Sequence, residues 1–110
     1  MPQLYRKGTW RGAGSFWSPD PTIAETYGRG PWVTCRPTGA VLTVGSDEDL
    51  ATALAQLGVA DAAARVLDAD WLTPDVFAQL QRHSITWVVK PVDPSVSAAV
   101  EWVYVGAGVP

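Results

Sequence analysis

The residues best suited to chemistry lie between positions 15 and 27, where Phe16 and Tyr27 are eleven positions apart. This segment reads SFWSPDPTIAETY, which is typical of a short aromatic strand followed directly by a helix that carries a second ring. One ring can stand at the end of the strand and the other about two turns into the helix. Two rings that face each other across such a corner form a slot for a flat heteroaromatic group.

Two charged residues outside this segment could bind the rest of a ligand whose flat group lies in the slot. Arg6 lies upstream of the slot, and its planar guanidinium suits the oxygens of a phosphate or a ribose. Glu101 lies near the end of the chain, and a carboxylate beside a sugar stabilises positive charge that develops on the ring. Together with the slot, these two residues indicate a nicotinamide site.

Other residues that can carry chemistry have simpler interpretations. The acids at 47–49 complement the positive end of a helix, and no second group of ligands accompanies them, so we expect no metal site. Cys35 is the only cysteine and lies in an apolar run, which favours a small buried thiol. His83 is the only histidine and falls at a predicted helix end, so we interpret it as structural.

Composition and charge limit the class of protein. The chain has 110 residues, of which 47% are hydrophobic and 17% charged, so we expect one globular domain over 1–110. Residues 1–36 carry five basic and two acidic side chains, whereas residues 37–110 carry three basic and nine acidic ones. This balance makes nucleic acid a less favoured partner, because affinity for phosphates needs many cations. A local basic region beside one pocket instead suits a dinucleotide.

No segment has the pattern of a signal peptide or the length of an apolar membrane span. We therefore expect a cytoplasmic protein that does not associate with a membrane.

Periodicity and turn residues predict an α+β fold in a single compact domain, with split mixed and antiparallel β-sheets and short helices. Asp20 and Pro21, the acidic run after Ser46, and Thr73 with Pro74 have the chemistry of helix starts. The expected strands cover residues 3–7, 15–18, 32–36, 40–44, 85–89 and 99–105. The expected helices begin at 21, 47, 59 and 74, and those in the middle end near 58 and 67.

Three segments together resemble the ADP-ribosyltransferase superfamily. LYRKG at 4–8 is similar to the first motif of that family in its arginine form. The segments SFWSPD and AETY at 15–20 and 24–27 resemble the middle motif of the poly(ADP-ribose) polymerase and diphtheria-toxin branch, in which two aromatics hold the nicotinamide. The strand VEWVYV at 100–105 looks like the last strand, which presents the catalytic glutamate.

The resemblance implies an ADP-ribosyltransferase-like fold and an NAD-dependent transferase that releases nicotinamide and needs no metal. Glu101 and Arg6 would be the catalytic residues, with Arg6 holding a phosphate or the adenine-side ribose. The NAD-binding set would comprise Tyr5, Arg6, Arg11, Phe16, Trp17, Ser18 and Tyr27. In it, backbone groups near Tyr5 bind the carboxamide, Arg11 reaches the pyrophosphate, and Ser18 is the motif serine. Trp10 and Trp17 can border the pocket or belong to the core.

The acceptor and the reaction outcome stay open at this point. Arginine-modifying members have a second acid two residues before the glutamate, where this chain has Ala99, so arginine modification is in doubt. A protein acceptor or host target is the leading expectation, and an antitoxin or inhibitor is a further candidate partner. The alternatives are an NAD glycohydrolase toxin and a non-catalytic phage or antidefence module of the same fold.

Overall fold

The computed structural model describes residues 2–92 and 99–110, and its elements follow the order that the sequence predicts. The strands are β1 (Leu4–Lys7), β2 (Phe16–Trp17), β3 (Trp32–Cys35), β4 (Ala40–Thr43), β5 (Ile85–Pro91) and β6 (Val100–Tyr104). The helices are α1 (Pro21–Ala24), α2 (Asp47–Gln56), α3 (Ala62–Leu67) and α4 (Pro74–Arg82), with a 3₁₀ turn, η1 (Glu25–Tyr27), directly after α1. The predicted α+β class is confirmed.

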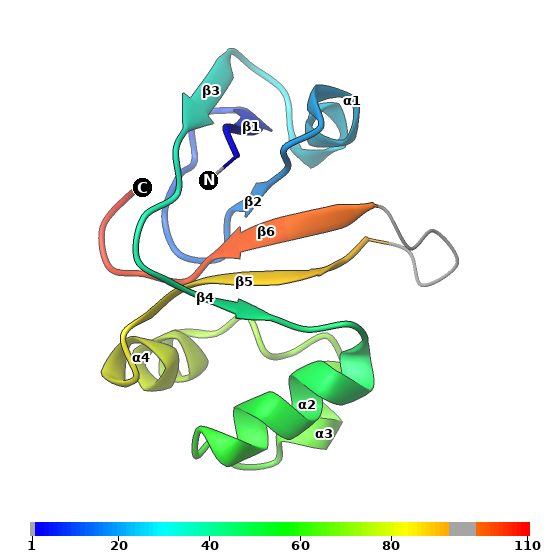
Figure 1. Ribbon diagram of the computed structural model, residues 1–110, viewed down its shortest axis with the longest axis vertical. Helices are drawn as coiled ribbons and strands as arrows, with labels where there is room; N and C mark the ends of the chain where they lie inside the picture. Colours follow the sequence, from blue (N-terminus) through cyan, green and yellow to red (C-terminus); the bar gives the residue numbers. More distant parts are fainter. Residues whose placement is uncertain (1, 93–98) are drawn as a thin grey trace.

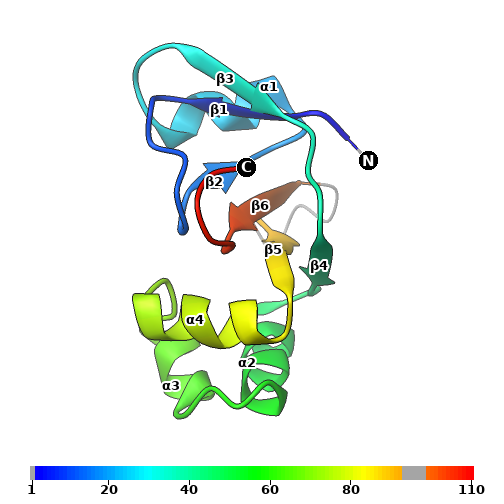
Figure 2. The same ribbon diagram turned by 90° about the vertical axis from the view of Figure 1, so that its left-hand side faces the viewer.

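The strands form two sheets. The four-stranded sheet has the order β2-β6-β5-β4, in which β4 and β5 are parallel and the other pairs antiparallel. β1 and β3 form a second, antiparallel pair. Tyr5 and Ser18 exchange backbone hydrogen bonds of 2.8 and 3.0 Å, which join the two sheets. The figures show the large sheet between β1, β3 and α1 on one side and α2, α3 and α4 on the other (Figures 1 and 2).

The helices begin where the capping residues predict. Ser46 Oγ accepts a hydrogen bond from the backbone N–H of Asp49, and Asp20 Oδ1 accepts one from that of Thr22. These side chains satisfy backbone donors that have no partner inside the helix. Pro74 occupies the first turn of α4, where its missing N–H costs nothing.

The helix predicted to begin at residue 59 is shorter than expected, because α3 begins at Ala62. Gly58 and Asp61 have φ angles of 90° and 56°, which lie in the left-handed region. A right-handed helix cannot pass through such residues, so the chain turns between α2 and α3. Sequence periodicity does not reveal the left-handed conformation of Asp61, so it places the start of this helix too early.

Two hydrophobic clusters cover the two faces of the large sheet. The cluster on the helical side contains Leu50, Leu54, Val76, Leu80, Val88, Val103 and Val105, among others. The cluster on the opposite side is aromatic and contains Leu4, Trp17, Trp87, Val89, Trp102 and Tyr104. Trp87 is its centre, with ring centroids of Trp17, Trp102 and Tyr104 at 6.2, 5.9 and 5.1 Å in edge-to-face arrangements.

Alternation along β6 decides which way Glu101 faces. Trp102 and Tyr104 enter the aromatic cluster, and Val103 enters the helical one. Glu101 therefore projects from the helical face, because successive side chains of a strand point to opposite sides. Phe16 is the register partner of Val103 and packs on that same face. The fold thus brings a carboxylate and an aromatic ring to one side of the sheet.

No helix within residues 2–92 and 99–110 is long and apolar enough to cross a membrane.

Candidate functional site

Three residues from distant parts of the chain form one cluster, which we call the Phe16–Tyr27–Glu101 cluster. Phe16 begins β2, Tyr27 ends η1, and Glu101 is the second residue of β6. The ring centroids of Phe16 and Tyr27 are 5.8 Å apart, and the Tyr27 hydroxyl donates to Glu101 Oε2 at 3.4 Å. β2 pairs with β6 in the large sheet, and α1, which leads directly into η1, lies on the β2 side of that sheet (Figure 1).

The carboxylate of Glu101 has a second partner, Lys90. Lys90 Nζ lies 3.0 Å from Glu101 Oε1, and the two residues are register partners on β5 and β6. Their side chains are only 17% and 13% exposed, so the ion pair is largely shielded from water. Sequence reasoning missed Lys90. The sequence signal is a single cation directly after the apolar run at 87–89, and it gives no indication of the partner.

Tyr27 remains a neutral hydroxyl donor well above physiological pH. Burial raises its pKa far above the ordinary value, and the negative charge of Glu101 and their hydrogen bond raise it further. The phenol therefore donates to the carboxylate rather than competing with it for protons.

The two rings contact each other, so the predicted slot is closed in this conformation. Their planes are inclined by 51° at a centroid distance of 5.8 Å. A flat group stacked between parallel rings needs about 7 Å, because each carbon contact takes roughly 3.5 Å. Phe16 and Tyr27 must separate before a flat ligand can lie between them. Tyr27 sits at the end of a three-residue turn, which has few hydrogen bonds of its own to hold it.

Arg6 lies next to the cluster, and its hydrogen bonds stabilise the loop that precedes Phe16. Its Nη1 donates to the Phe16 carbonyl at 3.0 Å, and its Nε donates to the Trp10 carbonyl. The residue is only 8% exposed, and burial lowers its pKa from the ordinary value without removing its charge. Two of its five N–H donors thus hold the backbone between β1 and β2.

The other predicted NAD-binding residues lie outside the Phe16–Tyr27–Glu101 cluster. Trp17 is fully buried in the aromatic cluster on the opposite face, where its Nε1 donates to Ser15 Oγ. Ser18 is fully buried, and its hydroxyl accepts from the Asp20 N–H. Its backbone is bridged to that of Tyr5. The contacts of Trp17, Ser18 and Tyr5 thus give all three residues a structural role.

Two further predictions concern the Gly-rich loop at 8–14. Arg11, which was expected to reach a pyrophosphate, donates from Nη2 to the Pro110 carbonyl at 2.7 Å. It therefore points to the C-terminal segment rather than to Glu101. Trp10 is 61% exposed, so of the two ambiguous tryptophans only Trp17 belongs to the core.

The remaining reactive side chains are not assembled into a site. Cys35 is half-buried beside the aromatic cluster, and burial raises the pKa of its thiol despite the opposing charge of Arg11. His83 is exposed at the end of α4. Within the described residues, no group of three or more His, Cys, Asp or Glu side chains could hold a metal ion.

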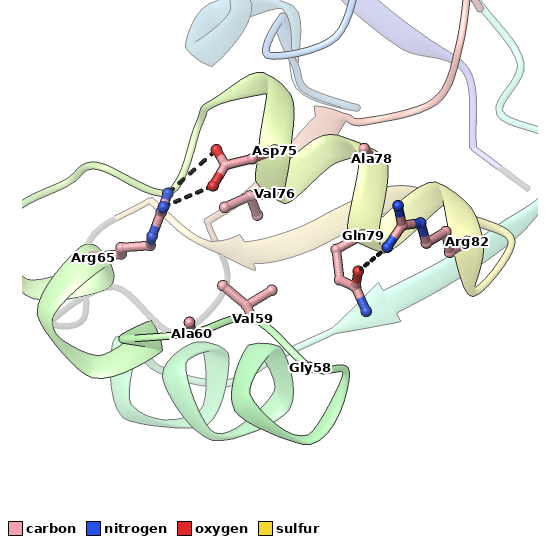
Figure 3. A pocket seen from close by; sticks show the side chains of 9 residues that line it. All are labelled: Gly58, Val59, Ala60, Arg65, Asp75, Val76, Ala78, Gln79 and Arg82. Atoms are coloured by element: carbon pink, nitrogen blue, oxygen red, sulfur yellow. Dashed lines mark hydrogen bonds and ion pairs between the residues drawn. The ribbon is translucent and has the colours of Figure 1, made fainter.

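A cavity of about 310 Å³ lies among the helices and shares no residue with the Phe16–Tyr27–Glu101 cluster (Figure 3). Two of its charged side chains form an ion pair, and the third contacts a neutral amide. Arg65 and Asp75 face each other with an N–O distance of 2.7 Å, and Arg82 donates to Gln79 at 3.2 Å. The lining contains no aromatic side chain on which a flat group could stack, so we place the candidate site at the Phe16–Tyr27–Glu101 cluster.

The sequence matches no protein-family model, and comparisons with curated proteins and with solved structures likewise found no match.

Replacing Arg6 tests its bracing role. We expect Arg6→Ala to lower the free energy of unfolding by about 3 kcal/mol, because two hydrogen bonds from a charged donor are lost. Urea denaturation measures this loss. Arg29→Ala changes an exposed arginine of the same region and should cost less than about 0.5 kcal/mol. Equal midpoints for Arg6→Ala and the wild type would contradict the bracing role.

Alkaline pH tests the environment of Tyr27. Above a pH of about 10 the unfolded chain has released the phenolic proton, whereas folded Tyr27 retains it because its pKa is raised. The free energy of unfolding therefore falls as the pH rises through this window. Tyr27→Phe has no such proton, so between pH 10 and 11 it should lose about 0.5 kcal/mol less, allowing for partial solvent screening. Urea midpoints that fall in parallel for both proteins would contradict this environment.

Proposed function

We propose that this protein is an NAD-dependent ADP-ribosyltransferase that releases nicotinamide and transfers ADP-ribose to a protein acceptor. The observation that carries the proposal is the contact between Tyr27 and Glu101, residues 74 positions apart. It joins an aromatic pair suited to a flat heteroaromatic group to a carboxylate suited to a ribose. The resemblance of the three sequence segments around these residues to the ADP-ribosyltransferase superfamily supports the same proposal.

The chemistry of the reaction matches these residue types. When the bond between nicotinamide and ribose breaks, nicotinamide leaves with the electron pair and positive charge develops on the ribose. Glu101 would stabilise that charge and accept a hydrogen bond from the ribose 2′-hydroxyl. Its Oε2 already accepts from a hydroxyl, that of Tyr27. A ribose hydroxyl that replaces the phenol would make a contact of the same kind.

Binding in this proposal requires the two rings to part. Nicotinamide would enter between Phe16 and Tyr27, and Tyr27 would leave Glu101 as the ring moves. Stacking against two rings offsets the loss of their mutual contact.

Arg6 would act on the phosphates while keeping its structural contacts. It holds the Phe16 carbonyl, so its charge lies close to the strand that carries the aromatic ring. Residues 1–36 have a net charge of +3, which favours a ligand with two phosphates at this end of the molecule.

The test is release of nicotinamide from NAD, measured by chromatography. Wild-type protein should release nicotinamide, and Glu101→Gln should lower the rate by about 100-fold or more, because one electrostatic partner of the transition state is lost. Glu48→Gln, the same change at an exposed residue of α2, should retain wild-type activity. A wild-type protein that neither consumes NAD nor gains thermal stability from it would overturn the proposal.

Transfer and hydrolysis are separated by labelled NAD. Label on a protein of a cell lysate, dependent on Glu101, supports a transferase. Nicotinamide release with the label remaining on free ADP-ribose identifies an NAD glycohydrolase that uses the same cluster.

A further inference from the structure

We propose that Lys90 is a positioning residue that fixes the carboxylate of Glu101, an inference that rests on the proposed function. Lys90 does not reach the reacting atoms in this role. It acts through its contact with Glu101, to which it is joined across two neighbouring strands.

The contact is built into the sheet. Lys90 and Glu101 are register partners in the antiparallel pair β5–β6, so their backbones hold the two side chains beside each other. The ammonium lies 3.0 Å from Glu101 Oε1 and also donates to the Pro91 carbonyl at 3.3 Å. Two partners therefore restrain the head of a side chain that is otherwise flexible.

Because it is largely buried, the ion pair of Lys90 and Glu101 interacts more strongly than an ion pair on the surface. The Lys90 and Glu101 side chains are 17% and 13% exposed, whereas those of Lys7 and Glu25 are 30% and 58% exposed at a distance of 3.7 Å. Water screens the surface pair strongly and the shielded pair much less. Loss of Lys90 would also leave the Glu101 carboxylate without its charged partner.

The two oxygens of Glu101 have different partners. Oε1 is held by Lys90, on a strand in the middle of the sheet, and Oε2 is held by Tyr27, at the end of a short turn. When a ligand displaces Tyr27, Oε2 becomes available while Oε1 stays held. Lys90 thus prevents the Glu101 carboxylate from rotating while the ligand is bound. The carboxylate therefore stays directed toward the ribose.

Among the basic residues that follow position 36, Lys90 is the one that pairs with Glu101. After residue 36 the sequence contains three basic residues, and two of them, Arg65 and Arg82, line the separate cavity of Figure 3. The third is Lys90.

Three variants test the assignment. Lys90→Met keeps the length of the side chain and removes the charge, and Lys90→Arg keeps the charge. Arg65→Met is the control, because it removes a cation from the ion pair with Asp75, which lines the separate cavity. Thermal unfolding establishes that each variant is folded at the assay temperature.

Kinetic measurements should show that Lys90→Met lowers kcat while the Kd for NAD hardly changes. Lys90→Met should lower kcat for nicotinamide release about 10- to 100-fold, because a misdirected carboxylate costs rate. The Kd for NAD, from tryptophan fluorescence, should change less than about threefold, because the stacking rings are intact. Lys90→Arg should recover most of the rate, and Arg65→Met should match the wild type. A fall in kcat that Lys90→Arg does not recover, or an unchanged kcat in Lys90→Met, would overturn the assignment.

A crystal structure of Lys90→Met tests positioning without reference to activity. The Glu101 carboxylate should leave its wild-type position or occupy several, and lose its contact with Tyr27. If it stays in place with that contact intact, Lys90 does not position it. If the wild type releases no nicotinamide but Glu101 moves in Lys90→Met, the proposed function fails and the positioning role of Lys90 stands.

Discussion

Aromatic rings packed around Trp87 set the arrangement of the large sheet and, through it, the position of the candidate site. Trp17, Trp102 and Tyr104 meet this ring from two neighbouring segments, β2 and β6, so the aromatic cluster fixes how both strands are set against β5. A shift of β6 by one residue would turn every side chain to the other face. The position of Glu101, next to Trp102, follows directly from this packing.

The same constraint explains why the candidate site lies at the margin of the helical face. Phe16 and Trp17 are adjacent, so burial of Trp17 in the aromatic cluster sends Phe16 to the opposite face, where Glu101 also projects. Tyr27 completes the cluster from η1, and Arg6 holds the backbone of Phe16. Core packing and site geometry are therefore linked through neighbouring residues of two strands.

Sequence reasoning anticipated the elements better than the contacts. Caps such as Ser46 and Asp20 act locally, so the starts of α1 and α2 follow from the residues themselves. The left-handed conformation of Asp61 depends on how α2 and α3 pack, and periodicity could not reveal it. The pairing of Lys90 with Glu101 requires the register of β5 and β6, which no local pattern specifies. For the same reason the separation of Trp17 from Phe16 by the sheet, and the turn of Arg11 toward Pro110, emerged only from the structure.

In the complex that we propose, a nicotinamide ring binds between Phe16 and Tyr27 with its ribose beside Glu101. NMR measurement of nuclear Overhauser contacts between NAD and the aromatic protons of the protein tests it most directly, with Glu101→Gln slowing turnover during data collection. We expect contacts from the nicotinamide protons to both rings, together with loss of the mutual contact between Phe16 and Tyr27. Bound NAD whose nicotinamide protons contact neither ring would contradict it.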